Sequence, residues 1–127
     1  KRILKPIAHE PTSKTGILHK AGTISMARWA PGTATGDFSI LVSDMDSLDA
    51  QPQATGDTAG YAAFGRVVDG MDGVRKIFDA PISATKGEGV LKGQILAAPV
   101  KIFSARRVAI PKPVVPILPS APPTPTR

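Results

Sequence analysis

The sequence predicts a mainly β, antiparallel domain with one flanking helix and an extended, proline-rich tail. Between residues 1 and 110 the apolar runs are short and are bounded by Gly, Pro and Asp, which is typical of strands joined by turns. The chain has 12 glycines and 13 prolines among its 127 residues, so a substantial part of it must form turns and irregular loops. This composition argues against a helical bundle.

Four apolar segments are the expected strands. In chain order they are 23–27, 38–42, 61–67 and 95–105, the last with a break near Pro99. We expect Met26, Phe38, Ile40 and Phe64 to fill the core of the domain. The segments 51–60 and 82–93 are rich in Gly, Thr, Gln and Lys and are expected to be loops.

One helix is expected, over residues 71–78. Met71, Val74, Ile77 and Phe78 share one face of it, and an acidic residue lies at its N-terminus, where the helix dipole favours negative charge. The apolar stripe predicts packing against the core.

Composition divides the chain into a single domain, 1–110, and a tail, 111–127. The tail carries a proline at almost every second or third position, so it cannot form regular backbone hydrogen bonds and favours an extended polyproline II conformation. Three interpretations of the tail stay open: a linker or disordered end, a ligand for a proline-recognising groove, or a source of X-Pro bonds for the chain's own fold.

Charge and hydropathy exclude several classes of partner. The formal charge is +6, but the basic residues gather at the two ends of the chain and are not interleaved with aromatics, so we expect no nucleic-acid partner. No apolar run reaches the roughly 20 residues of a membrane span, and we expect no membrane partner. There is no cysteine, which excludes disulfides and thiolate metal sites.

No cofactor or metal site is expected. The acidic run that begins at Asp44 has Asp49 where a calcium-binding EF-hand loop needs Gly, and Thr55 where it needs Glu. The glycines at 87–93 have one residue too many for a dinucleotide fingerprint. His9 and His19 have no partner pattern of a zinc site, and both are expected at the surface.

A set of ordered motifs resembles cyclophilin-type peptidyl-prolyl isomerases, particularly bacterial ones. The motifs are Gly22-Thr23-Ile24-Ser25-Met26-Ala27-Arg28, Pro31, Thr33-Ala34-Thr35-Gly36-Asp37-Phe38-Ser39-Ile40, Leu48-Asp49 and Phe64-Gly65-Arg66-Val67-Val68-Asp69-Gly70-Met71-Asp72. The resemblance covers roughly residues 6–107 and implies an antiparallel, cyclophilin-like barrel that is incomplete in this chain. In that fold 100–105 would lie in the closing strand.

The resemblance also implies a proline-binding groove. Carried over residue by residue, the substrate-binding positions are Ala27, Arg28, Asp37, Ser39, Leu48 and Tyr61. Asp37 stands where the family usually has Gln, and Ser39 where it usually has the Phe of the pocket floor, so substrate binding is expected to be weak or altered. The family's catalytic arginine lies in a segment that precedes the matched region, so no catalytic residue is expected in this chain.

The function implied by the resemblance is acceleration of X-Pro bond rotation in polypeptides that contain proline. The alternative is a catalytically weak, cyclophilin-like peptide-binding or chaperone module, and a third hypothesis is an adaptor that acts through the proline-rich tail. The compartment stays open, with the bacterial periplasm or secretion favoured over the cytoplasm.

Half a barrel would expose unpaired strand edges and half a core. We therefore expect an N-terminal segment of the gene product, or a second chain, to complete the barrel.

Overall fold

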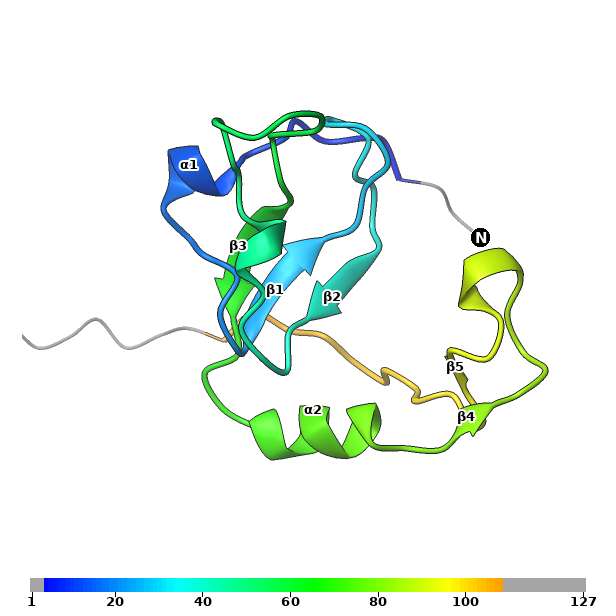
Figure 1. Ribbon diagram of the computed structural model, residues 1–127. Helices are drawn as coiled ribbons and strands as arrows, with labels where there is room; N and C mark the ends of the chain where they lie inside the picture. Colours follow the sequence, from blue (N-terminus) through cyan, green and yellow to red (C-terminus); the bar gives the residue numbers. More distant parts are fainter. Residues whose placement is uncertain (1–3, 109–127) are drawn as a thin grey trace, which may run out of the picture.

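The sheet of the domain has three short antiparallel strands. The computed structural model describes residues 4–108 (Figure 1), and the tail predicted at 111–127 lies outside them. The strands are β1 (Thr23–Met26), β2 (Phe38–Ile40) and β3 (Ala62–Arg66), in the order β2-β1-β3. They confirm the predicted strands at 23–27, 38–42 and 61–67, each with shorter ends.

The register of the sheet separates a polar face from an apolar one. Across β1 and β2, Ile24 pairs with Ile40, Ser25 with Ser39, and Met26 with Phe38. Because paired residues point to the same side and neighbours along a strand alternate, the two isoleucines, Met26 and Phe38 share one face. The two serines share the other.

Little apolar surface is buried within the described part of the chain. The fully buried apolar side chains there are Ala34, Leu41 and Ala63, while Phe38 and Phe64 are 50% and 51% exposed. The expectation that Met26, Phe38, Ile40 and Phe64 fill a core is therefore wrong for the described residues, since none of the four is fully buried. Residues 4–108 cover this apolar face only in part.

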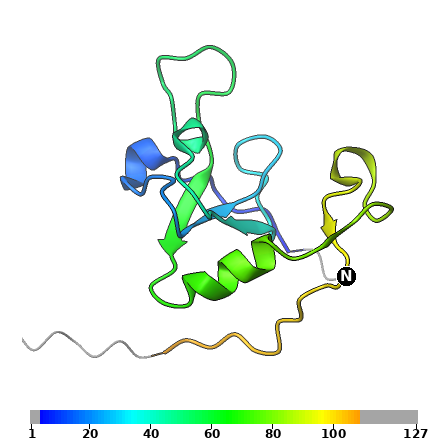
Figure 2. The same cartoon turned by 60° about the horizontal axis from the view of Figure 1, so that its bottom comes forward.

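The predicted helix is present as α2 (Met71–Phe78), with the expected bounds. Gly70 precedes it in a left-handed conformation (φ 84°), which glycine adopts without a steric cost, and Asp72 lies in the first turn. Figures 1 and 2 show that α2 runs alongside the sheet, near β2. Packing of its stripe against the core is only partial, because Ile77 and Phe78 remain 41% and 67% exposed.

Beyond α2 the chain forms a separate small hairpin. It consists of β4 (Ile82–Ser83) and β5 (Ile95–Leu96), with the 3-10 helix η2 (Gly89–Leu91) between them. The predicted strand 95–105 is therefore wrong beyond residue 96, and the predicted loop 82–93 contains β4 and η2. Pro99 cannot donate to a ladder, and residues 97–108 have no strand partner within the described part of the chain, so no closing strand forms there.

The remaining short elements lie on the loops around the sheet. The sequence reading missed α1 (Thr12–Thr15), a single turn that starts after Pro11 and ends at Gly16, whose φ is 73°. The other is the 3-10 helix η1 (Asp46–Leu48). The antiparallel β class is confirmed, but the barrel is not closed within residues 4–108, where both β2 and β3 are edge strands.

Candidate functional site

A small hollow at one end of β1 and β2 gathers most of the predicted substrate-binding residues. Its volume is about 220 Å³. Ala27, Ser39, Leu48 and Tyr61 line it, and Ser25 and Met26 complete the lining. The structure therefore brings together four predicted positions: Ala27 directly after β1, Ser39 in β2, Leu48 in η1 and Tyr61 directly before β3.

Backbone hydrogen bonds fix the relative positions of these lining residues. The Tyr61 amide donates to the Leu48 carbonyl (2.8 Å), which ties the start of β3 to the end of η1. Ser39 lies opposite Ser25 across the sheet, so the polar face of the sheet enters the hollow. The lining combines the apolar side chains of Met26 and Leu48 with the Tyr61 ring and two hydroxyls, a composition suited to a small apolar group next to a peptide backbone.

Arg28 and Asp37 do not line the hollow. Asp37 is exposed, and its carbonyl accepts a hydrogen bond from the Ala27 amide (2.9 Å), which continues the pairing of β1 and β2. The Arg28 side chain is only 3% exposed. Its guanidinium lies 4.9 Å from the centroid of the Tyr61 ring, so it is packed behind the aromatic residue of the hollow.

A buried histidine supports β1 from the polar side of the sheet. His19 is fully buried, and its Nδ1 lies 2.6 Å from Asp49 Oδ1, while its Nε2 lies 2.8 Å from Ser25 Oγ. A carboxylate only accepts, so Nδ1 carries the proton, and in the neutral ring Nε2 accepts from the Ser25 hydroxyl. The expectation that His19 is a surface residue is wrong, because two side chains and the sheet enclose it.

The His19 network has the residue types of a hydrolytic triad but not its access. Ser25 contributes to the lining of the hollow but is only 4% exposed, so little of its hydroxyl is open to a substrate carbonyl. The network instead joins two segments of the hollow, because Ser25 precedes Met26 and Asp49 follows Leu48. Sequence reasoning missed it because its members are 6 and 30 residues apart and match no local pattern. His9 is partly buried, and its Nε2 donates to the Ala59 carbonyl (3.1 Å).

Hydrogen bonds to exposed carboxylates account for the resolved pKa shifts. The Asp46 and Asp44 carboxylates raise the pKa of Lys20, whose Nζ lies 2.7 Å and 3.4 Å from them. The Ala21 amide, which donates to Asp44 (2.8 Å), lowers the pKa of that carboxyl. The Arg28 guanidinium holds the pKa of Asp57 below its ordinary value. In the acidic run from Asp44, Asp44 and Asp46 therefore contact Lys20, whereas Asp49 contacts His19.

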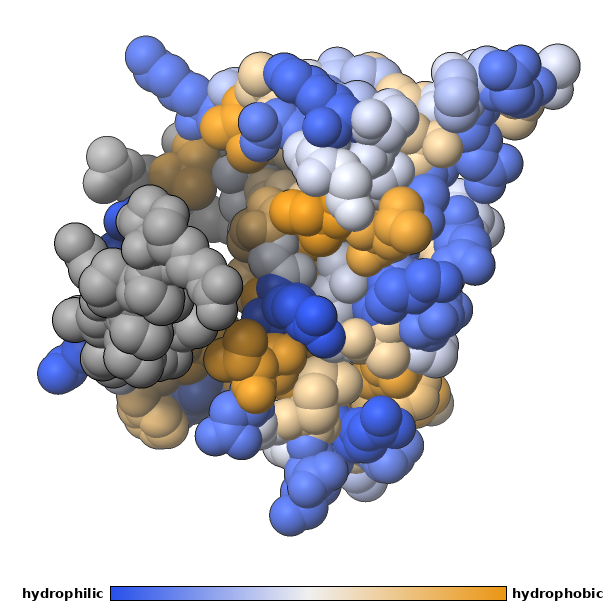
Figure 3. Space-filling view, turned by 90° about the vertical axis from the view of Figure 1, so that its left-hand side faces the viewer, coloured by the Kyte–Doolittle hydropathy of each residue, from blue (hydrophilic) through white to orange (hydrophobic). Residues whose placement is uncertain are grey.

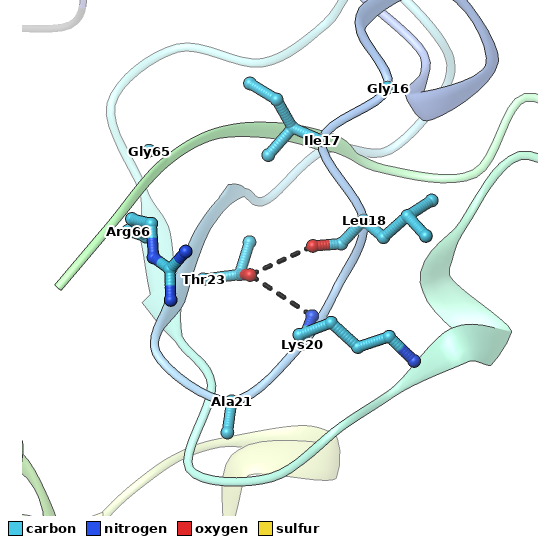
Figure 4. A pocket seen from close by; sticks show the side chains of 8 residues that line it. All are labelled: Gly16, Ile17, Leu18, Lys20, Ala21, Thr23, Gly65 and Arg66. Atoms are coloured by element: carbon cyan, nitrogen blue, oxygen red, sulfur yellow. Dashed lines mark hydrogen bonds between the residues drawn. The ribbon is translucent and has the colours of Figure 1, made fainter.

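A larger hollow, of about 530 Å³, lies at the opposite end of β1 (Figure 4). The Thr23 hydroxyl sits at its centre, donates to the Leu18 carbonyl (3.0 Å) and accepts from the Lys20 amide (3.1 Å). The Thr23 hydroxyl is therefore already partnered within the chain. On the face seen in Figure 3, orange hydrophobic patches alternate with blue hydrophilic side chains.

The described residues contain neither a metal site nor a membrane-spanning helix. Within residues 4–108 no three His, Asp or Glu side chains converge as metal ligands. Over the same range, no helix has both the length and the apolar character needed to cross a bilayer.

Comparison with known proteins decides the family. The sequence model of the family described as "Cyclophilin type peptidyl-prolyl cis-trans isomerase/CLD" matches residues 1–106. The chain belongs to the cyclophilin-type peptidyl-prolyl cis-trans isomerase family. The match includes β1, β2, β3 and α2, and with them every residue that lines the small hollow.

Two bacterial relatives agree with this assignment. A peptidyl-prolyl cis-trans isomerase of Acinetobacter baylyi is 39% identical over 102 residues, which cover 80% of this chain and 49% of the relative. Peptidyl-prolyl cis-trans isomerase B of Escherichia coli is 42% identical over 74 residues, which cover 58% of this chain and 43% of the relative. The chain thus spans about half the length of the cyclophilins that it matches.

Proposed function

We propose that the protein carrying this chain is a peptidyl-prolyl cis-trans isomerase that acts on X-Pro bonds in flexible polypeptides. The observation that carries the proposal is the hollow itself, where Ala27, Ser39, Leu48 and Tyr61 converge from four separate segments. Its volume of about 220 Å³ suits a ring of proline size. Family membership and the names of the two relatives support the same activity.

The reaction needs no covalent intermediate. Rotation about a peptide bond has a barrier of about 18–20 kcal/mol, because resonance gives the bond partial double-bond character. A site lowers this barrier if it binds the twisted peptide more tightly than the planar one. In the hollow, Met26, Leu48 and Tyr61 would hold the proline ring, and the backbone of β1 at Ala27 would orient the peptide.

The hydrogen-bond donor to the prolyl nitrogen belongs, on this proposal, to a segment outside the chain. Arg28 is a poor substitute, because its guanidinium already donates to the Gly60 and Trp29 carbonyls and to Asp57. Loss of one preorganised donor costs roughly 3 kcal/mol of transition-state stabilisation, by analogy with oxyanion holes. Residues 1–127 by themselves should therefore be a far weaker catalyst than the whole protein.

We further propose that this segment completes the barrel. The apolar face of β2 and the apolar stripe of α2 meet across a groove of about 300 Å³, which is lined by apolar residues: Phe38, Ile40, Val42, Val74, Ile77 and Phe78. Open edges at β2 and β3 leave two rows of backbone groups for further strands. An added layer would pair these edges and cover the groove.

A protease-coupled isomerisation assay on the full protein, as its gene encodes it, tests the activity. The expected result is acceleration of the cis-to-trans rate of an Ala-Pro peptide in proportion to protein concentration. A rate equal to that of the uncatalysed peptide would overturn the proposal.

One observation favours the alternative of a catalytically weak peptide-binding module. Ser39 is exposed in the lining, where a cyclophilin usually has an aromatic floor. A hydroxyl offers less apolar contact to a proline ring than a phenyl ring does. Peptide binding without acceleration in the same assay would support this second function.

A further inference from the structure

Arg28 makes more internal contacts than its place beside the hollow requires. Its Nε donates to the Gly60 carbonyl (2.9 Å), and one terminal nitrogen donates to the same oxygen. The other terminal nitrogen donates to the Trp29 carbonyl (3.0 Å) and to Asp57 Oδ2 (2.7 Å). Four of the five guanidinium hydrogens are thereby committed within the chain.

Gly60, the main acceptor of these bonds, is wedged against the segment that follows η1. A side chain at Gly60 would lie 2.6 Å from the Leu48 carbonyl oxygen and from the backbone at Asp49 and Ala50. Its φ of 60° is a conformation that glycine adopts most readily. Arg28 thus binds the carbonyl of a glycine that packs directly against the backbone of Leu48.

Arg28 also contacts Tyr61, the residue that follows Gly60. The Tyr61 amide follows the Gly60 carbonyl and donates to Leu48 O (2.8 Å), and the guanidinium covers the Tyr61 ring. Tyr61 and Leu48 are two of the six residues that line the hollow. Contacts of Arg28 thus fix one wall of the hollow relative to β1.

We infer that Arg28 is a positioning residue of the proline-binding hollow, acting through Gly60 and Tyr61 with Asp57 as its anchor, and not a contact to substrate. The kinetic consequences of this inference rest on the proposed function. The support that Arg28 gives to Gly60 and Tyr61 does not. The inference revises the role that the family resemblance implies for Arg28. It also assigns a role to Asp57 in the loop 51–60.

Two variants of the full protein separate positioning from direct contact. Arg28→Lys keeps the charge but loses the paired donors and the planar stacking. Asp57→Asn removes the carboxylate charge that anchors the Arg28 guanidinium. The Asp57 side chain is 51% exposed, so this variant should fold. Arg75→Lys, an exposed arginine on α2, is the matched control.

The first readout is steady-state isomerisation of Ala-Pro and Glu-Pro peptides. For Arg28→Lys we expect KM to rise about tenfold with kcat within about twofold, equally for both peptides, because the wall of the hollow shifts for any substrate. For Asp57→Asn we expect a rise of about threefold in KM. A merely destabilised fold would lower the apparent kcat at constant KM and would overturn the inference.

A direct contact predicts the opposite result for Asp57→Asn. Removing the anchor would free the guanidinium for the substrate, so KM would stay constant or fall, most of all for the Glu-Pro peptide. Either outcome would overturn the positioning role.

The second readout is hydrogen exchange at the Tyr61 amide, which does not depend on activity. We expect exchange to be about tenfold faster in Arg28→Lys and unchanged in Arg75→Lys, because the Tyr61–Leu48 hydrogen bond loses its support. Unchanged exchange in Arg28→Lys would overturn the inference. An inactive wild-type protein would overturn only the proposed function, since the exchange comparison would still decide the role of Arg28.

Discussion

At the scale of single residues, Ser39 is the clearest difference between the hollow and the proline pocket that the family resemblance implies. Ser39→Phe should lower KM for Ala-Pro peptides by roughly fivefold, because a phenyl ring would add about 1 kcal/mol of apolar contact with the proline ring that a hydroxyl lacks. Steady-state isomerisation of the full protein measures this. Ser43→Phe, exposed and outside the hollow, is the control and should leave KM unchanged. A Ser39→Phe variant that binds no better than wild type would mean that the hollow is not the peptide site.

Substitutions at Gly60 and Gly56 test how closely the loop 51–60 packs against the backbone at the end of η1. Both have positive φ, 60° and 87°, but only a side chain at Gly60 would meet backbone atoms, whereas nothing lies within 4 Å at Gly56. Gly56→Ala should cost about 1 kcal/mol of unfolding free energy from φ alone, and Gly60→Ala at least twice as much. Urea unfolding of the full protein measures both. Equal losses would show that Gly60 is not wedged.

Asp57 gives the Arg28 contact a pH dependence. Its pKa is lowered in the fold, chiefly by the hydrogen bond from Arg28, so its stabilising contribution is present above the unfolded pKa and is lost as pH falls through the folded value. The stability difference between wild type and Asp57→Asn should thus be constant above about pH 5 and shrink below about pH 4. Urea unfolding at several pH values measures the difference. A difference that grows on acidification would contradict the assignment.

The limits of sequence reasoning at this scale are visible in two residues. Tyr61 and Leu48 could be placed in one site because the family resemblance implies a substrate-binding role for both positions. His19 could not, because its burial depends on Asp49 and Ser25, which approach it only in the folded chain. Arg28 shows the same limit, since its partners Asp57 and Gly60 lie 29 and 32 residues away.

At the scale of elements, α2 was predictable to the residue because local signals mark both its start and its face. Gly70, the acidic first turn and the period of Met71, Val74 and Ile77 all lie within one short segment. The strand expected at 95–105 failed because apolar composition alone does not supply a partner, and only residues 95–96 have one within the described range. The turn α1 was missed, although Pro before it and Gly after it are the usual flanking residues of a helix.

The exposed stripe of α2 yields a prediction about the complete protein. If a further layer covers the groove, Ile77→Gln should lower the unfolding free energy by about 2–3 kcal/mol, because a buried apolar side chain is replaced by an amide. Lys76→Gln, on the exposed side of the same helix, should change it by less than about 0.5 kcal/mol. Urea unfolding of the full protein gives both values. Two equally small losses would mean that the groove stays open to solvent.

At the scale of the whole molecule, the described chain is stabilised in an unusual way. Its buried positions include Thr12, His19, Thr23 and Ser25, whereas its larger apolar side chains, such as Phe38, Phe64 and Phe78, are half exposed or more. A domain normally gains most of its stability from the burial of such apolar surface. The family resemblance led us to expect such exposure, because it implies a barrel that is incomplete in this chain and half a core left uncovered.

The unfolding of residues 1–127 alone tests most directly whether this chain shares its core with a further segment. We predict that the isolated chain binds the hydrophobic dye ANS and unfolds in urea without a cooperative transition, because its apolar groove and two sheet edges are uncovered. The full protein should bind no ANS and unfold cooperatively. A monomeric 1–127 chain that unfolds cooperatively and leaves ANS fluorescence unchanged would contradict the account.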